Sequence, residues 1–379
     1  MKLMGNQFEL TVVAADASWA DECIDLGVQE IQRIERLLTT FSEDSETALI
    51  NAQAGVAPVT VSPETFGLIE RSIRISALTQ GAFDITYGSI DKRLWNFDPT
   101  MTSLPEPDVA KKMVRLIDYR KIVLDRGRQS VFLKEKGMRI GFGGIGKGYA
   151  AEKTKALLIR LGVSSGVVNA SGDLTAWGYR PDGSPWTIGV VHPDRTQEIV
   201  AYLNITDMAI ATSGNYEKFV TIDGKRYSHT IDPTTGLPVT GIKSVTILCP
   251  NAEIADAIAT PVMIMGVRAG LDMINQMRHI EAILIDDQNG IHTSENIHTH
   301  YKKKTAMKTR TILVIGVALF PVLLPSCSPV KEYQKNRLND SEMTLSSRKV
   351  EKNEANFQSY REGSSGANGG KTGGGCGCN

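Results

Sequence analysis

Residues 141–148 read Gly-Phe-Gly-Gly-Ile-Gly-Lys-Gly and lie between a strand-like run and a helix-like run. The N–H groups at the start of a helix favour an anion, so this glycine loop is a candidate phosphate site. The loop satisfies G-x-G-x-x-G and most of a Walker A motif, although Gly148 stands where that motif needs Ser or Thr. A dinucleotide-binding fold carries its loop after the first strand, whereas about 140 residues precede this one. This position argues against a Rossmann oxidoreductase and leaves open a phosphate loop or a tight turn that only packs.

Helical periodicity flanks the loop on both sides. Apolar residues recur at helical spacing from Trp19 to Leu38, which predicts an amphipathic helix. Ser62-Pro63-Glu64 supplies an N-cap, a proline at the first helical position and an acidic residue, and predicts a second helix that ends near Gly81. A third helix is expected from about Lys147 to Leu161, before Gly162.

Strand patterns are more numerous than helical ones. Asn289-Gly290 follows an apolar run and is a strong hairpin signal. Alternating or β-branched runs occur at residues 8–13, around Val123, Val131, Ile140, Val167, Ile188 and Ile199, and at residues 245–249 and 282–285. Because these strands come in hairpin-like groups, the sequence predicts an α+β fold with largely antiparallel sheets.

Composition narrows the class of protein. The 379 residues include 42 Lys+Arg and 42 Asp+Glu, so the formal net charge of +0 gives no general attraction to nucleic acid, and we expect no nucleic-acid partner. Only two of the five cysteines, Cys23 and Cys249, precede residue 327, which is too few for a disulfide-stapled domain.

Three further segments carry chemically useful side chains. Asp256 and Thr260 are spaced i, i+4 and share a helix face, where their oxygens suit a hard cation such as Mg²⁺, although such a pair is more often a solvated face. His229 and Asp232 precede a Pro/Gly turn and form either a proton-transfer pair or an ordinary hydrogen-bonded pair. Two hydroxyl- and glycine-rich loops, at residues 169–173 and 211–216, are candidates for ligand contacts or simple turns.

Taken together and in this order, the segments resemble the ApbE family of FAD:protein FMN transferases over nearly all of residues 4–300. Several collinear motifs are far more specific than any one of them. The resemblance is carried by residues 40–46 (TFSEDSE) with Asn51, 81–86 (GAFDIT) with Leu94-Trp95, 143–150 (GGIGKGYA), 168–173 (VNASGD), 211–216 (ATSGNY), Ser228-His229 with Asp232, Pro233, Thr235 and Gly236, and 255–257 (ADA) with Ala259-Thr260.

The resemblance implies a T-fold-like α+β enzyme that binds FAD and Mg²⁺, transfers FMN to a Thr or Ser hydroxyl of an acceptor protein and releases AMP. It implies a metal held by Asp256, Thr260 and the carbonyl of Gly146. It implies His229 as general base or phosphate contact, with Asp232 as its orienting partner. The flavin nucleotide is expected to contact Phe41, Ser45, Asp84, Thr86, Gly144, Lys147, Asp173, Thr212, Ser213 and Gly214.

This sequence departs from the family pattern at three positions. Phe41 stands where many relatives carry a Tyr that stacks on the flavin, Ser171 replaces a usual Gly, and Glu152 sits where Asp is common. A phenyl ring still stacks but lacks the hydroxyl contact. Two alternatives to the transferase therefore stay open, namely a diphosphatase that splits FAD into FMN and AMP, and a flavin-binding module without turnover.

The residues after about 301 differ from the rest of the chain, because their order is that of a signal segment followed by a polar tail. Lys302-Lys303-Lys304 and Met307 to Arg310 precede the apolar run from Thr311 to Leu324 and then Cys327, in the order of a bacterial lipoprotein signal with Cys327 as the lipidated residue. A buried helix is the alternative. The following tail resembles a short uncharacterised family of bacterial lipoproteins that end in glycines and Cys376-Gly377-Cys378-Asn379, and this last pair of thiols is a weak candidate for a soft metal.

These patterns predict three parts: a flavin transferase domain at 1–300, a basic flank with a signal-like segment at 301–327, and a disordered Gly/Ser-rich tail at 328–379. The chain begins with a strand pattern rather than a signal peptide. Basic residues before the apolar run favour a cytoplasmic side for the catalytic domain, with residues 311–327 as a membrane tether. A fusion of two neighbouring reading frames would give the same pattern.

Overall fold

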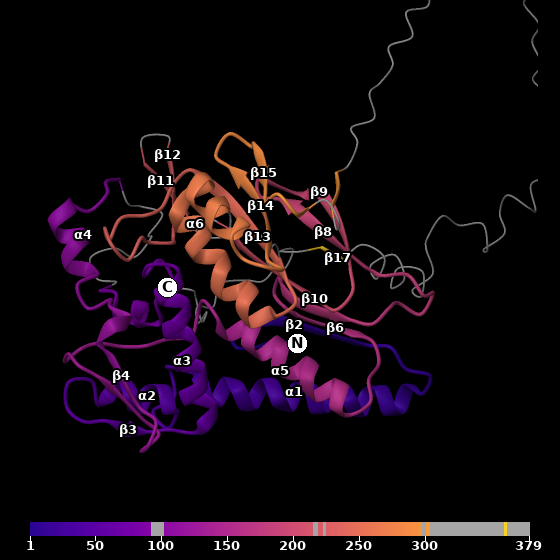
Figure 1. The fold of residues 1–379 in the computed structure, drawn as a ribbon, viewed down its shortest axis with the longest axis horizontal. Coiled ribbons are helices and arrows are strands. Elements are labelled where there is room, and N and C mark those ends of the chain that lie inside the picture. The colour runs from indigo at the N-terminus through magenta and orange to yellow at the C-terminus, as the bar shows by residue number, and fades with distance from the viewer. Residues whose placement is uncertain (92–101, 215–218, 223–224, 298–300, 304–359, 362–379) are drawn as a thin grey trace, which may run out of the picture.

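An eight-stranded sheet forms the centre of the molecule, and all neighbours in it run antiparallel, as predicted. The computed structural model describes residues 1–91, 102–214, 219–222, 225–297, 301–303 and 360–361 (Figure 1). The strands of this sheet, in spatial order, are β1 (Lys2–Leu3), β2 (Asn6–Val12), β6 (Gly166–Ala170), β7 (Asp173–Trp177), β10 (Met208–Gly214), β13 (Ile242–Cys249), β14 (Glu281–Asp286) and β15 (Ile291–Thr293).

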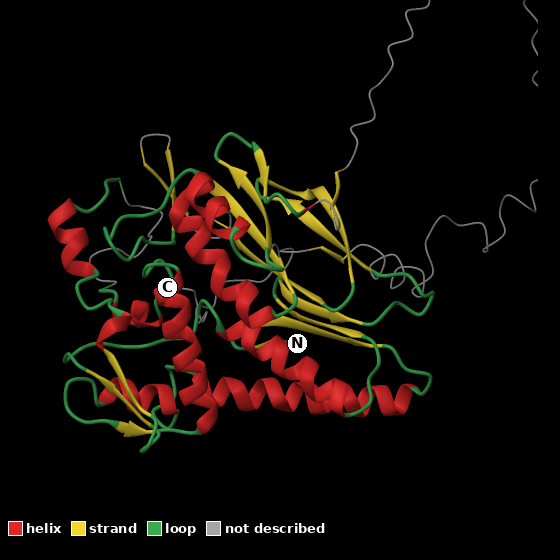
Figure 2. Ribbon diagram, viewed as in Figure 1, coloured by secondary structure: helices red, strands yellow, loops and turns green. Residues whose placement is uncertain are grey.

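Helices cover one face of this sheet (Figure 2). They are α1 (Ala17–Leu38), α5 (Gly146–Arg160) and α6 (Ala252–Asn275), with α3 (Pro63–Leu78) beside them. The apolar side of α6 packs on β10, β13 and β14, where Ile258, Val262 and Ile247 are almost fully buried. The apolar side of α1 packs on α5, and these helices share a second core with β2 and α3. Burial of these apolar faces is the main stabilising contribution to this arrangement.

The opposite face of the central sheet is covered by a smaller sheet in the order β16-β9-β8-β17. Its strands are β8 (Trp186–His192), β9 (Arg195–Ile205), β16 (Tyr301–Lys303) and β17 (Tyr360–Arg361), the last parallel to β8. Side chains from both sheets, such as Ile188, Leu203 and Ile210, form the core between them.

The remaining elements lie outside these two sheets and the helices that cover them. They are α2 (Glu46–Ala52), the strands β3 (Val59–Thr60), β4 (Ile122–Asp125) and β5 (Ser130–Leu133), the 3₁₀ helices η1 (Ile85–Ser89) and η2 (Tyr119–Lys121), α4 (Pro107–Met113), and the hairpin of β11 (Phe219–Ile222) with β12 (Lys225–Ser228).

The predicted helices and the hairpin are confirmed. Ser62 caps α3, because its hydroxyl accepts the N–H of Thr65 at 3.2 Å. Asn289 adopts a positive φ of 66° in the turn between β14 and β15, a left-handed conformation that Asn adopts more readily than most residues.

The strand expected around Ile140 is wrong. Ile140 is fully buried in an extended segment outside any sheet. The side-chain amide of Asn51 takes the place of a neighbouring strand, since it donates to the Ile140 carbonyl at 3.0 Å and accepts the Ile140 N–H at 2.7 Å. Gly141 then donates to the carbonyl of Ile85 at 2.9 Å. The glycine loop is thus held by side chains and by η1 instead of a strand ladder.

Among the described residues, α6 alone is long and apolar enough by composition to cross a membrane. Its packing on β10 and β13 accounts for that composition. The signal-like segment at 311–327, the tail apart from β17, and the cysteines Cys327, Cys376 and Cys378 lie outside the described residues.

Candidate active site

The first turns of α5 and α6 meet in direct backbone contact, and the glycine loop leads into this contact. The N–H of Gly148 donates to Oδ2 of Asp256 at 2.9 Å. A Cβ placed on Gly148 would lie 2.1 Å from the Ala252 carbonyl oxygen and 2.7 Å from Cβ of Asp256. Glycine is therefore required at residue 148, because any side chain would push the two helices apart.

Asp256 is a buried carboxyl group with a strongly perturbed acidity. Burial, and then the negative charge of Asp173, raise its pKa to about 7, while Lys147 and the Gly148 N–H act in the opposite direction. A carboxylate in this environment is costly to ionise unless a positive charge lies beside it. The structure thus places at residue 256 an oxygen ligand that a cation would stabilise in its charged form.

Lys147 and Asp173 form an ion pair beside Asp256, with the Asp173 side chain 3% exposed. Lys147 belongs to the first turn of α5, and Asp173 begins β7. The pair joins the glycine loop to the central sheet. It brings two of the residues expected to bind the flavin nucleotide into one place.

Hydroxyl groups from α6 and β10 also belong to the candidate site. Thr260 lies one helical turn beyond Asp256, and its Oγ1 is 3.1 Å from Oγ of Ser213. The neighbouring Thr212 pairs with Thr246 on β13 at 2.8 Å between the hydroxyl oxygens. Gly214 follows at the end of β10. The sheet and the helix therefore bring residues 211–214 and the Asp256–Thr260 motif together.

The donor set at this place suits Mg²⁺. Oxygen ligands from one carboxylate, one hydroxyl and one carbonyl match a hard cation that keeps positions for phosphate and water. In the described ranges no group of three or more His, Cys, Asp and Glu side chains forms a metal cluster. Gly146, Asp256 and Thr260 are the residues that would hold the ion.

Asp84 and Thr86 are buried and hold the loops beside the glycine loop. Asp84 accepts the Thr86 N–H at 2.8 Å, the Thr86 hydroxyl at 2.6 Å and the Tyr119 N–H at 2.7 Å. Burial raises the pKa of Asp84 to about 6 despite these bonds. The ring of the preceding Phe83 lies 3.6 Å from where a Cβ of Gly144 would stand. These contacts give Asp84 and Thr86 a structural role, and their contact with the flavin nucleotide stays a prediction.

Phe41 and Ser45 lie around the start of α2. The side chain of Ser45 is buried and caps α2, accepting the Ala48 N–H at 3.0 Å. Phe41 is 75% exposed, which is unusual for a phenyl ring in a folded protein. The ring is thus available for stacking on a planar ligand, whereas Ser45 orders the backbone nearby.

His229 and Asp232 follow β12. His229 is half-buried. The carboxylate of Asp232 accepts the Thr234 N–H at 2.7 Å and the Thr235 hydroxyl at 3.1 Å, so it stabilises the turn that ends at Gly236. The orienting role of Asp232 toward His229 stays a prediction.

Sequence reasoning missed the polar side chains that tie the helix starts together. Glu152 accepts the Ala252 N–H at 2.9 Å, and Arg71 pairs with Glu253 at 2.6 Å. In the sequence, Glu152 stands out only as a departure from the family pattern. Since its partner is 100 positions away in the chain, no local pattern could have indicated this bond.

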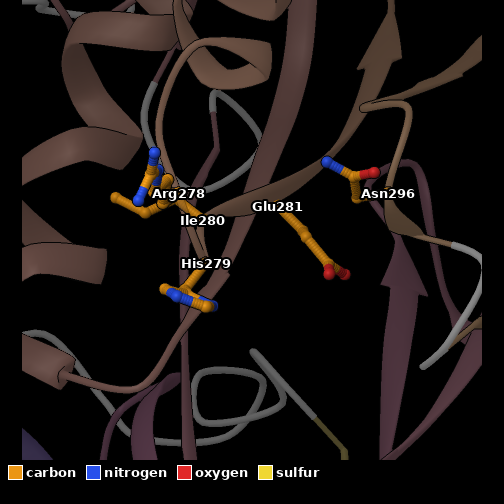
Figure 3. A pocket seen from close by; sticks show the side chains of 5 residues that line it. All are labelled: Arg278, His279, Ile280, Glu281 and Asn296. Carbon is orange, nitrogen blue, oxygen red and sulfur yellow. The ribbon is translucent and has the colours of Figure 1, made fainter.

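Two cavities in the described part of the chain involve none of these site residues. One, of about 420 Å³, is lined by Arg278, His279, Ile280, Glu281 and Asn296 (Figure 3). The other, of about 450 Å³, lies along residues 265–272 near the second half of α6.

Comparisons with known proteins identify relatives of both parts of the chain. Residues 330–379 match the model of a domain of unknown function, DUF4266, which fits the resemblance of the tail to an uncharacterised family. The FAD:protein FMN transferase of Treponema pallidum is 32% identical over 70% of this chain and 78% of its own length, and that of Klebsiella pneumoniae is 31% identical over 77% and 85%.

Solved structures of this kind also match. An ApbE protein from Thermotoga maritima superposes with a TM-score of 0.72 at 27% identity, covering 79% of this chain and 97% of that one. A flavin transferase ApbE from Vibrio cholerae gives a TM-score of 0.68 at 26% identity, covering 79% and 96%. The model of the ApbE family matches residues 4–284, and the chain belongs to this family.

Proposed function

We propose that this chain transfers FMN from FAD to a Thr or Ser hydroxyl of an acceptor protein, in a Mg²⁺-dependent reaction that releases AMP. The observation that carries the metal dependence is the buried Asp256 carboxyl, whose pKa is raised to about 7 beside the start of α5. The flavin chemistry is supported by the names of the relatives, which are FAD:protein FMN transferases. A buried acid at a helix N-terminus, next to hydroxyl oxygens, suits a cation and a pyrophosphate together.

In this proposal, different residues of the chain bind the pyrophosphate, the metal ion and the flavin ring. The first turn of α5 and Lys147 would bind the pyrophosphate, since both offer positive potential. Asp256, Thr260 and the Gly146 carbonyl would hold Mg²⁺, which when bound neutralises the pyrophosphate and stabilises charge on the transferred phosphoryl group. The exposed ring of Phe41 would stack on the flavin.

His229 would take the proton from the acceptor hydroxyl. In this step the hydroxyl oxygen bonds to the phosphorus of the FMN half, and the bond from that phosphorus to the bridging oxygen breaks. AMP leaves with the bridging oxygen. Catalysis of this type depends on placement and electrostatics more than on covalent participation of the protein.

A second candidate is hydrolysis of FAD to FMN and AMP. It is favoured by Phe41, whose ring is 75% exposed and lacks the hydroxyl of the Tyr that many relatives carry. Water then replaces the acceptor hydroxyl at the same phosphorus, and AMP forms without an acceptor. A flavin-binding module without turnover would bind FAD and release no AMP.

We further propose that residues 1–300, 301–327 and 328–379 are three parts with different functions, although β16 and β17 pair with strands of the first part. The catalytic part would lie on the cytoplasmic side, with residues 311–327 as a membrane tether. The support is the order of basic, apolar and small residues that ends at Cys327. Cells that express either the full chain or its Cys327→Ser variant can be fractionated and labelled with a fatty-acid probe. If Cys327 is lipidated, the protein that retains Cys327 takes up the probe and the variant does not.

Incubation of the full chain with FAD, with Mg²⁺ or EDTA, and with a panel of candidate acceptor proteins tests the activity. In-gel flavin fluorescence of the acceptor, with an equal amount of AMP that needs Mg²⁺, is the expected result. AMP formed equally without any acceptor would identify the diphosphatase, and bound FAD without AMP would identify the carrier.

A further inference from the structure

Two side chains from other helices hold the first turn of α6, and Asp256 follows directly at the start of the second turn. The first is Glu152 of α5, whose Oε2 accepts the N–H of Ala252, the first residue of α6, at 2.9 Å. The helix's own N-cap, Asn251, is occupied with the Ile254 N–H at 3.1 Å. Glu152 therefore supplies a second cap from a neighbouring helix, since the first N–H groups of a helix have no partner within it.

Gly148 and Glu152 are spaced i, i+4 and lie on one face of α5. Gly148 donates to Asp256, and Glu152 accepts from Ala252. Hydrogen bonds thus run in both directions between α5 and α6. Sliding of one helix along the other would break both of them.

The second anchor comes from α3. Arg71 makes a two-point contact with Glu253, with Nε–Oε1 at 2.6 Å and Nη2–Oε2 at 3.1 Å, and the Glu253 side chain is only 10% exposed. A planar, bidentate pair of this kind fixes direction as well as distance.

Arg71 also reaches the first turn of α5. Its guanidinium carbon lies 5.8 Å from the ring centroid of Tyr149, and the Tyr149 hydroxyl donates to Glu64 of α3 at 2.6 Å. The starts of α5 and α6 are therefore both tied to α3. The separation between Gly146 and Asp256 depends on these ties, because each residue lies within a turn of them.

We propose that Glu152 and Arg71 are positioning residues for the cation site, and that they set the distance between the α5 and α6 oxygen ligands without touching the ion. This inference rests on the proposed function, since it takes Asp256, Thr260 and Gly146 as the ligands. Groups that hold metal ligands in place commonly change metal affinity 10- to 100-fold when they are removed.

The test measures Mg²⁺ affinity directly, by calorimetric titration of the full chain, alongside the thermal melting temperature and the dependence of AMP release on Mg²⁺. Glu152→Ala and Arg71→Gln are each expected to weaken Mg²⁺ binding by about 10-fold or more. Glu152→Gln is expected to restore most of the affinity, because its side-chain carbonyl still accepts the Ala252 N–H. In turnover, the KM for Mg²⁺ should rise more than kcat falls.

Lys155→Ala is the matched control. It removes the 3.5 Å ion pair with Glu152 but leaves the acceptor for Ala252 in place, so Mg²⁺ affinity should not change. If Glu152→Ala does not fold, Arg71→Gln and the comparison of Glu152→Gln with Lys155→Ala carry the test.

Two results would overturn the inference: folded Glu152→Ala and Arg71→Gln proteins with unchanged Mg²⁺ affinity, or a parent protein that binds no Mg²⁺. A parent protein that binds Mg²⁺ but releases no AMP from FAD would refute the proposed function alone. In that case the Mg²⁺ titrations would still decide the role of Glu152 and Arg71.

Discussion

Replacement of Asp256 by Asn should stabilise the metal-free protein and abolish its response to Mg²⁺. Folding raises the pKa of Asp256 from 3.8 to about 7, chiefly through burial. At about 1.36 kcal/mol per pKa unit, a neutral side chain at residue 256 would raise the free energy of unfolding by at most about 4 kcal/mol above pH 7. The Asn carbonyl still accepts the Gly148 N–H, but its amide N–H groups need partners, which reduces the expected gain to about 1–3 kcal/mol.

The sign of this effect depends on pH. Between about pH 4 and pH 7 the native protein binds the Asp256 proton more tightly than the unfolded chain does, so the stability of the parent protein falls as pH rises through this range. The Asn variant lacks this contribution. The difference in unfolding free energy should therefore be small at pH 4 and largest at pH 8.

Denaturant unfolding at pH 4, 6 and 8, with and without Mg²⁺, measures both effects. Asp21→Asn is the control, because Asp21 is an exposed residue of α1 and its replacement should not alter the Mg²⁺ response. An Asp256→Asn protein that is less stable than the parent at pH 8 without metal would refute the reasoning. So would full retention of stabilisation by Mg²⁺.

Three further substitutions test other parts of the site. Gly148→Ala should destabilise the protein by about 1–3 kcal/mol, because its Cβ would lie 2.1 Å from the Ala252 carbonyl oxygen, and should weaken Mg²⁺ binding; an unchanged melting temperature would contradict this. Asp84→Asn should lower the free energy of unfolding. The stability of the parent protein falls between about pH 4 and pH 6 partly because the pKa of Asp84 is raised, and the variant should lack this part of the fall, as unfolding at several pH values would show. His229→Ala should slow single-turnover FMN transfer about 10²-fold or more while leaving FAD affinity nearly unchanged, and equal transfer rates would exclude proton transfer by this residue.

Local patterns in the sequence predicted the elements, and chain contacts over long separations decided how these elements meet. Helical spacing predicted α1 and α5 to within a few residues, because a helix that buries one face must repeat its apolar residues with the helical period. The Asn-Gly pair predicted the β14–β15 turn for an equally local reason. The strand expected at Ile140 failed because the Asn51 side chain, 89 positions away, satisfies the backbone there.

The motifs of the candidate site were also predictable from local patterns, but the way they meet was not. The glycine loop and the Asp256–Thr260 spacing were visible as patterns, and the structure brings them into contact through Gly148. Their approach depends on the absence of a side chain at residue 148 and on the Glu152 bond to Ala252. Neither property follows from periodicity, since both are set by a partner roughly 100 positions along the chain.

The charges at the site are unbalanced in a way that couples the metal to its substrate. Lys147 pairs with Asp173 and offsets only part of the cost of ionising the buried Asp256 carboxyl, which also has the negative charge of Asp173 beside it. A divalent ion would more than compensate this carboxylate and leave excess positive charge next to the start of α5. A pyrophosphate brings the negative charge that this excess requires, and it also supplies oxygen ligands that the protein does not provide. Mg²⁺ and FAD should therefore each strengthen the binding of the other by the same factor, because coupling between two ligands on one protein is reciprocal.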